Sequence, residues 1–156
     1  MESLLPGSDE YWMAAALARA ALAAQQLEVP VGAIIVRDGE IIGEGWNQPI
    51  SGDDPTAHAE VVALRDAARR VGNYRLVDAD LYVTIEPCMM CVGAMVHARI
   101  RRLIFGATEP KAGAVISQLR ALELPHLNHQ VEFRGGVMAQ QCSDQIRAFF
   151  RSRRQK

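Results

Sequence analysis

A hairpin signal near the start of the chain constrains the fold more than any other feature. Val31–Arg37 is a strand-like run rich in β-branched residues, and Glu40–Trp46 is a second run of similar length. Between them lies Asp38-Gly39, a pair that favours the left-handed backbone of a two-residue hairpin turn. The sequence therefore predicts an antiparallel strand pair over residues 31–46.

A helix is expected before this hairpin, over residues 11–27. Ser8 is a suitable N-cap, and the acidic pair Asp9-Glu10 suits the positive end of a helix. Pro30 is a natural stop. The buried face is expected to contain Trp12, Leu17 and Ala20.

After the hairpin, helix-like and strand-like segments alternate to the end of the chain. Loops are expected over 47–57 and 108–116. Helices are expected over 58–71, 87–97 and 137–154, a helical turn over 119–124, and strands over 81–85, 102–107 and 131–134. This order predicts an α/β domain with helices on both faces of a mixed sheet, because the strands after the hairpin are expected to run parallel.

Length and composition favour one domain spanning residues 1–156, with residues 1–8 flexible and 147–156 forming a basic helix end. The net charge of −1 gives no overall indication of nucleic acid binding. An odd count of three cysteines that includes a Cys-x-x-Cys pair favours a reducing compartment. The N-terminus is acidic, and the alanine-rich run over 13–24 is short and contains Arg19, so a cytoplasmic protein without a membrane span is expected.

Two short motifs carry the chemistry. His58-Ala59-Glu60 supplies one imidazole and a carboxylate, and Pro87-Cys88-Met89-Met90-Cys91 supplies two thiols. One histidine and two cysteines are three zinc-type ligands, and three protein ligands leave the fourth tetrahedral position open, as in catalytic sites. Cys88 and Cys91 are one helical turn apart, near a helix N-terminus that favours thiolates.

His58 and Glu60 can share one site only under a geometric condition. Two residues apart in mid-helix, they would point about 200° apart. His58 must therefore lie at the junction between the preceding loop and the helix. Zinc lowers the pKa of a water molecule towards ~7, and a carboxylate beside the metal, such as Glu60, suits general acid–base work on that water.

Other interpretations of these residues are structural. A thioredoxin-type role for the Cys-x-x-Cys pair leaves His58 and Glu60 unexplained. Cys142 is expected to be a small buried residue of the last helix. Structural or surface roles are expected for His97, His126 and His129, and core packing for Met89, Met90 and Met95.

The combination of His-x-Glu with Pro-Cys-x-x-Cys is the signature of zinc-dependent nucleobase deaminases, and the chain resembles the bacterial tRNA-specific adenosine deaminases of the cytidine deaminase-like superfamily. The resemblance extends over nearly the whole chain after about residue 9. It is carried by residues 28–33, 43–47, 54–60, 73–76, 81–84, 86–91, 93–95 and 149–154. Of these, Asn73-Tyr74-Arg75-Leu76 and the Phe-Phe-Arg-x-Arg-Arg tail separate this family from free-base deaminases.

The resemblance implies a three-layer fold with a five-stranded mixed sheet flanked by helices, and a homodimer. It implies one Zn²⁺ per chain held by His58, Cys88 and Cys91, with Glu60 as the catalytic proton shuttle. The implied substrate is the wobble adenosine of a tRNA anticodon, typically of tRNA-Arg, converted to inosine. Asn47 matches the family asparagine that hydrogen-bonds the target base.

The loop after Ala107 resembles the family loop that touches the nucleotides flanking the target. Glu109 stands where the family usually has Asp, and Ile116 where a Gly is usual. The first change keeps the charge and lengthens the side chain, whereas the second could alter the backbone.

RNA binding is expected from local charge at the C-terminus. Five basic residues and no acidic residue occupy 147–156, beside Phe149 and Phe150. We therefore expect Phe150 and Arg153 to contact RNA by stacking and phosphate binding; a solvated helix end that suits the helix dipole is the structural alternative. The basic residues are Arg147, Arg151, Arg153, Arg154 and Lys156.

Two rival functions share parts of this pattern. A free nucleobase or nucleoside deaminase, of guanine or cytosine type, has the same zinc chemistry but does not need the basic tail. A zinc-stabilised RNA-binding module without catalysis leaves Glu60 without a role and requires a fourth ligand, which the sequence does not suggest.

Overall fold

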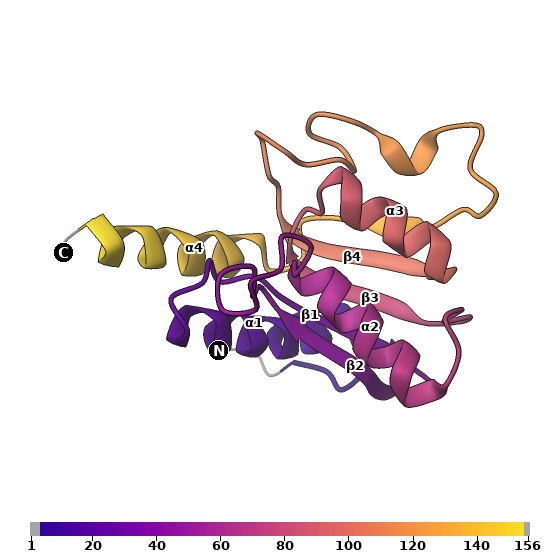
Figure 1. Ribbon diagram of the computed structural model, residues 1–156, viewed down its shortest axis with the longest axis horizontal. Helices are drawn as coiled ribbons and strands as arrows, with labels where there is room; N and C mark the ends of the chain where they lie inside the picture. The colour runs from indigo at the N-terminus through magenta and orange to yellow at the C-terminus, as the bar shows by residue number, and fades with distance from the viewer. Residues whose placement is uncertain (1–3, 155–156) are drawn as a thin grey trace.

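The computed structural model describes residues 4–154 of the chain, and its elements follow the predicted order (Figure 1). Each observed boundary lies within two residues of the expected one. The two ends of the expected domain, residues 1–3 and 155–156, lie outside the described residues. The elements are α1 (Asp9–Gln25), β1 (Gly32–Arg37), β2 (Glu40–Trp46), α2 (Ala59–Val71), β3 (Asp80–Ile85), α3 (Met89–Ala98), β4 (Arg102–Ala107), the 3₁₀ turn η1 (Ala121–Glu123), β5 (Glu132–Arg134) and α4 (Ala139–Arg154).

The five strands form one mixed sheet in the order β2-β1-β3-β4-β5. The expected hairpin pairs β1 with β2, and β4 is parallel to both β3 and β5. One pairing differs from the expectation that the later strands run parallel: β1 also pairs with β3, and that pair is antiparallel. The cause is the crossover through α2, which carries the chain past β1, so that β2 and β3 point the same way on either side of it.

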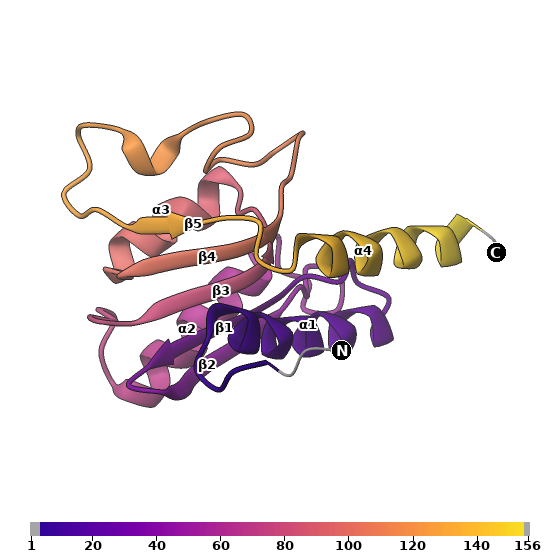
Figure 2. The ribbon, with the colours of Figure 1, turned by 180° about the vertical axis from the view of Figure 1, so that it is seen from behind.

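Helices cover both faces of this sheet, which gives the expected three layers (Figures 1 and 2). Side chains alternate along β1: Ala33 and Ile35 join the cluster beneath α2 and α3, whereas Ile34 and Val36 join the cluster beneath α1 and α4. A strand covered on both faces reads as a continuous apolar run rather than as alternating apolar and polar residues. Within residues 4–154, no helix is long and apolar enough to cross a membrane.

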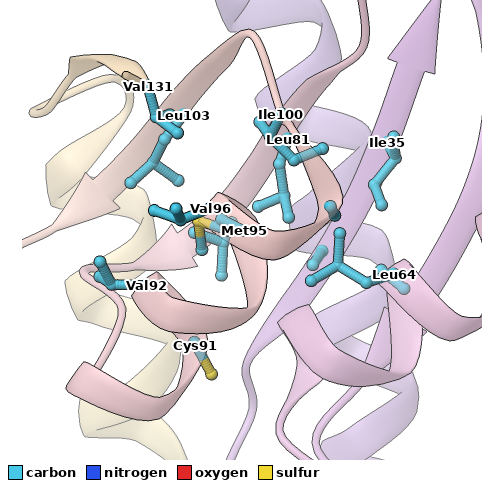
Figure 3. Packing of buried hydrophobic residues seen from close by; sticks show 14 of the residues in the cluster. Ile35, Leu64, Leu81, Cys91, Val92, Met95, Val96, Ile100, Leu103 and Val131 are labelled. Atoms are coloured by element: carbon cyan, nitrogen blue, oxygen red, sulfur yellow. The ribbon is translucent and has the colours of Figure 1, made fainter. Parts of the chain in front are cut away.

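The larger core cluster fixes α3 against the sheet (Figure 3). Val92, Met95 and Val96 project from α3 towards strand residues such as Leu81 and Leu103, and Cys91 lies at the edge of the same cluster. The expectation of three core methionines was wrong for two of them. Met95 is fully buried, but Met89 and Met90 are exposed, because the first turn of α3 buries Cys91 and Val92 instead and leaves the two methionines on its outer side.

The buried face of α1 also differs from the expectation. Trp12 and Leu17 are only partly buried, and the fully buried positions are Met13, Ala16, Ala20 and Ala23. The reason is the close approach of α1 to β1, where a Cβ at Gly32 would overlap the backbone of Ala16 and Ala20. Small residues are required at such a contact, whereas Trp12 packs against the cluster while only partly buried.

Two glycines of β2 let α2 lie directly on the strand. A Cβ at Gly43 would lie 2.6 Å from the Cβ of Ala67, and one at Gly45 would lie 2.5 Å from the carbonyl oxygen of Ala59 and the amide nitrogen of Ala63. No side chain fits between the strand and the helix at either position. Because α2 begins immediately after His58, these glycines set the height of that histidine above the sheet.

Replacing Gly45 by alanine is therefore expected to destabilise the protein by about 1–3 kcal/mol, the usual cost of overpacking a tight core. The free energy of unfolding in urea measures this effect. An unchanged unfolding midpoint would mean that α2 is not fixed by the backbone contact.

Candidate active site

The candidate residues follow three strands that finish at the same end of the sheet. β2, β3 and β4 run in the same direction, so their carboxyl ends lie together. His58 follows β2 after a loop, Cys88 follows β3 and Glu109 follows β4. The crevice outside the carboxyl ends of strands is the usual place for a ligand in open α/β sheets.

His58 lies at the loop–helix junction, as the geometric condition required. It is the N-cap of α2, with extended backbone angles (φ −71°, ψ 150°), and Glu60 lies in the first turn. The extended backbone at the cap turns the imidazole to the side on which Glu60 lies. The Glu60 side chain is buried, with 3% of its surface exposed.

The loop before His58 is held by buried and local hydrogen bonds. The Glu28 carboxylate is buried and accepts hydrogen bonds from the backbone N–H groups of Ile50 (3.3 Å) and Ser51 (2.6 Å). Asp54 accepts hydrogen bonds from the backbone N–H and the hydroxyl of Thr56, two residues before the histidine. These contacts fix the path along which the chain enters α2.

The three zinc-type ligand atoms lie as a metal ion requires. His58 Nδ1 is 3.5 Å from the Sγ atom of Cys88 and 3.5 Å from that of Cys91, and the two sulfurs are 3.8 Å apart. A tetrahedral zinc ion, with Zn–S bonds of about 2.3 Å and Zn–N bonds of about 2.05 Å, needs S···S near ~3.8 Å and S···N near ~3.6 Å. The residues therefore fit the ion without rearrangement. Among the described residues, this trio is the group of side chains found close enough together to hold a metal.

These contacts shift the pKa values of the ionisable side chains in the site. A hydrogen bond from the Cys91 thiol, together with the neighbouring His58, lowers the pKa of Cys88 to about 4, while the same hydrogen bond and burial raise the pKa of Cys91. The contact with Cys88 raises the pKa of His58. Burial raises the pKa of Glu60 to about 7, and the positive charge of a metal held beside it opposes that shift.

A small cavity of about 210 Å³ opens onto two of the three ligands, His58 and Cys88, and its lining also includes Glu60, Asn47 and Glu109. It is smaller than the ~300–1,000 Å³ typical of pockets for drug-sized ligands, which suits a single base. A larger hollow of about 610 Å³, whose lining includes four arginines, lies at the opposite end of the sheet. It contains none of the ligand atoms, so chemistry rather than size identifies the site.

The structure does not bring Phe150 and Arg153 into this cavity. Both lie on α4, which extends away from the sheet (Figures 1 and 2). Phe150 is 42% exposed, packs edge-on against Phe149 and lines a shallow hollow of about 460 Å³ on the helix surface. Lys156, also expected in the tail, lies outside the described residues. Cys142, in the first turns of α4, is buried as expected.

The sequence reasoning did not assign a role to Glu86, which lies between β3 and the first cysteine. Its carboxylate is buried and contacts the loop that carries Glu109. Although burial opposes ionisation, hydrogen bonds from Ser117, Ile116 and Glu109 lower the pKa of Glu86 to about 2. An acidic residue at the end of an otherwise apolar strand was the available signal.

The loop after β4 accommodates both departures from the family pattern. The backbone at Ile116 has a negative φ, so the position does not require glycine, and its N–H donates a hydrogen bond to Glu86. Glu109 is half-buried at the rim of the cavity, and its carboxylate accepts a hydrogen bond from the backbone N–H of Lys111.

Comparison with known proteins defines the class. Residues 6–107 match the family described as the cytidine and deoxycytidylate deaminase zinc-binding region. The match spans more than half of the chain and includes both motifs, so the chain belongs to this family of zinc-binding deaminases. Its cofactor is one zinc ion per chain, which the His/Cys/Cys trio fits.

Individual relatives place the chain within this family. It is 48% identical to the tRNA-specific adenosine deaminase of Haemophilus influenzae, over 95% of this chain and 86% of the relative. A solved structure from work on A-to-I editing by tRNA:A34 deaminases at the wobble position of transfer RNA is 41% identical, with a TM-score of 0.84 over 86% of this chain and 98% of that one. Guanine deaminase from Bacillus subtilis is 31% identical, with a TM-score of 0.64 over 96% of this chain and 95% of that one. The chain therefore groups with the tRNA-specific adenosine deaminases.

Proposed function

We propose that this protein deaminates the wobble adenosine of a tRNA anticodon, that of tRNA-Arg in particular, to inosine, with water consumed and ammonia released. The observation that carries the proposal is the arrangement of Glu60, buried beside three preformed zinc ligand atoms in a cavity sized for one base. The similarity to adenosine deaminases that act on tRNA supports the choice of base and of substrate.

The residues that would hold the zinc ion are His58, Cys88 and Cys91. When bound, zinc lowers the pKa of a water molecule and so supplies a nucleophile near neutral pH. Glu60 accepts the proton of the attacking water and donates it to the ring nitrogen beside the carbon under attack. It then helps transfer a proton to the departing amine, which leaves as ammonia. Its exclusion from bulk solvent keeps the proton on this path.

Two further residues of the cavity would bind the RNA. The amide of Asn47 offers both a donor and an acceptor to the edge of the target base. Glu109, on the rim, would contact a nucleotide next to the target. A target base in an anticodon loop can enter such a pocket at little cost, because it is already unpaired.

The rival functions make different use of the same site. A guanine or cytosine deaminase needs neither the tail nor flanking contacts, and the guanine deaminase relative is less similar than the relatives that act on tRNA. A non-catalytic zinc module needs a fourth ligand, and the described residues offer three around this point. Such a module would also give no role to the Glu60 carboxylate that is buried beside these ligands.

The test of substrate class compares three substrates in separate reactions. Zinc-loaded protein is incubated in parallel with an anticodon stem-loop that has adenosine at the wobble position, with free guanine and with cytidine, and ammonia is measured. Release from the stem-loop alone is expected. Release from a free base or nucleoside, and not from the stem-loop, would transfer the assignment to the first rival.

We propose that the basic end of α4 binds RNA phosphates, with Phe150 and Arg153 in contact with the anticodon arm. Removing the residues after Phe150 deletes Arg151, Arg153, Arg154 and Lys156. Up to four lost phosphate contacts are expected to weaken tRNA binding and to reduce the slope of log K against log salt by about 1–3. Filter binding at several salt concentrations measures this slope.

A control for the tail variant is Arg37→Ala, which removes one positive charge at the other end of the sheet, where β1 finishes. It is expected to leave tRNA affinity unchanged, and both variants should retain zinc. Unchanged affinity and salt slope after truncation would exclude the tail from the RNA interface.

We propose further that the protein forms a homodimer through the outer face of α2 and α3. An apolar groove there is lined by Leu64, Ala68, Tyr74, Ala94 and Ala98, among others. The exposed Met90 precedes Ala94 by four residues and so extends the same stripe of α3.

Ala94→Arg is expected to convert the dimer to a monomer, because it places a charge in the middle of this apolar groove. Sedimentation equilibrium of the 17.1-kDa chain measures the change. Tyr11→Arg, on the opposite face of the sheet, is the control and should remain dimeric. A monomeric wild-type protein at micromolar concentration would contradict the proposal.

We also propose a cytoplasmic location. None of the three cysteines forms a disulfide, although Cys88 and Cys91 lie close together. A zinc ligand pair of this kind is maintained where thiols stay reduced.

A further inference from the structure

The carboxylate of Glu86 is surrounded by one loop. It is 2% exposed and accepts five hydrogen bonds. One oxygen accepts from the Glu109 N–H (3.0 Å) and from the Ser117 hydroxyl. The other accepts from the N–H groups of Val115 (3.1 Å), Ile116 (2.8 Å) and Ser117 (2.9 Å). All five donors lie between residues 109 and 117.

The loop also packs against this carboxylate without space for a side chain. A Cβ at Gly113 would overlap the carboxyl group of Glu86. Two backbone hydrogen bonds join the same segments: Glu86 N–H donates to the Ala107 carbonyl (2.8 Å), and Ala114 N–H donates to the Pro87 carbonyl (2.9 Å). The loop therefore surrounds the Glu86 side chain and contacts it through both hydrogen bonds and close packing.

Glu86 connects this loop to the zinc ligands. It is two residues before Cys88, and it lines the same cavity as Glu109 and Ala112. The charge is satisfied by backbone N–H groups and one hydroxyl, since the ion pairs formed within residues 4–154 include none to Glu86. A buried carboxylate with donors from four residues of one loop fixes the shape of that loop, because each donor left unpaired would cost free energy.

We propose that Glu86 is a positioning residue: it holds the loop over residues 108–118 in a fixed place relative to Cys88, so that Glu109 meets the nucleotide beside the target base. The inference rests on the proposed contact of Glu109 with RNA. In this role Glu86 acts through the loop and takes no part in the proton transfers assigned to Glu60. Its effect is on binding and on the choice of flanking nucleotide.

Glu86→Gln is the informative substitution, because it keeps the shape of the side chain. The amide oxygen can still accept from Val115, Ile116 and Ser117. The amide NH₂ then faces the Glu109 N–H, so that donor opposes donor at the residue that matters. Glutamine therefore frees the Glu109 end of the loop, with little change in volume.

The experiment measures loop order and kinetics on the same zinc-loaded proteins. In Glu86→Gln, the backbone N–H of Glu109 is expected to exchange with solvent at least about tenfold faster, because it loses its acceptor, whereas the N–H groups of residues 115–117 keep theirs and should change less. KM for the anticodon stem-loop is expected to rise at least about tenfold, with a smaller change in kcat, because a displaced contact residue weakens binding. Zinc content should stay at one ion per chain.

Asp80→Asn is the matched control. Asp80 is also a buried carboxylate, at the other end of β3, where it pairs with Arg101 and Arg102. This variant is expected to lose stability while keeping KM and loop exchange within about twofold of wild type, since its partners lie far from the loop. A general loss of stability would affect both variants alike.

Gly113→Ala keeps Glu86 in the sequence but forces the loop and the Glu86 carboxyl group apart, and it serves if Glu86→Gln fails to fold. The same rise in exchange and in KM is expected. A double-mutant cycle with Glu109→Ala then tests the path: Glu86→Gln should add little to KM once Glu109 is removed.

Each outcome is decisive. KM and exchange near wild type in both loop variants would overturn the proposal, as would faster exchange with unchanged KM, since Glu86 would then be merely structural. If Glu109→Ala alone leaves KM unchanged while Glu86→Gln raises it, the contact assigned to Glu109 fails but the positioning role stands. If the stem-loop is not a substrate for wild-type protein, the proposed function fails, and exchange alone still reports the anchoring.

Discussion

Glu60→Ala is expected to retain its zinc ion and to lose turnover by at least about 100-fold, the lower end of the usual contribution of general acid–base catalysis. The carboxylate is buried beside the ligand trio but is not a member of it. Removing it deletes the group that moves protons between water, the ring nitrogen and the leaving amine. Steady-state kcat on the anticodon stem-loop, with zinc measured by mass spectrometry, separates these effects.

Glu60→Gln provides the matched control for packing, because it fills the same volume without a titratable group. It should be as inactive as the alanine variant, and both should unfold near the wild-type temperature. A Glu60→Ala protein that turns over at a rate near wild type would remove the proposed mechanism. Loss of zinc from both variants would instead make Glu60 part of the metal site.

Cys91→Ser is expected to abolish stoichiometric zinc binding. A serine hydroxyl does not ionise near neutral pH and is a poor substitute for a thiolate, while His58 and Cys88 alone leave two of four positions without a protein ligand. A ligand present at about 1,000 times its dissociation constant stabilises a fold by about 4 kcal/mol. Added zinc should therefore raise the melting temperature of the wild-type protein and not that of the variant.

The third cysteine supplies the control for this experiment. Cys142 is buried between α4 and the sheet, where its sulfur packs against Gly106. In sequence it lies far from the three ligand residues. Cys142→Ala should bind one zinc ion per chain, with a modest loss of stability from the small cavity that it leaves. Full zinc occupancy in Cys91→Ser would contradict the assignment of the ligands.

Local chemistry made the elements and the ligand trio predictable from sequence. The Asp-Gly turn set the hairpin, and Gly72 ends α2 in the left-handed conformation that glycine favours. The requirement that His58 and Glu60 face the same site predicts that His58 lies at a helix cap, and it is the N-cap of α2. The spacing of the cysteines then defined the other half of the site.

Long-range packing was not predictable in the same way. The buried face of α1 consists of small residues because the helix packs against Gly32 of β1. The antiparallel pairing of β1 with β3 depends on the position to which the crossover through α2 returns the chain. The role of Glu86 depends on the path of a loop more than twenty residues later. None of these contacts leaves a periodic signal in the sequence.

Two buried glutamates share one structural role at this site. Glu28 binds backbone N–H groups of the loop before His58, and Glu86 binds those of the loop that carries Glu109. Both loops border the cavity, and neither is fixed by regular secondary structure. The rims of the site are thus held by carboxylates that accept hydrogen bonds from the backbone, which preorganises the pocket for one base.

The most direct test of the account is the position of inosine in a full-length tRNA-Arg transcript whose anticodon begins with adenosine. The transcript is treated with zinc-loaded wild-type protein, and with Glu60→Ala as control, and is then sequenced by reverse transcription, in which inosine reads as guanosine. Conversion at the wobble position alone, with none in the control, is the predicted result. Conversion at other adenosines with the wobble position unchanged, or no conversion by an active zinc-loaded enzyme, would contradict it.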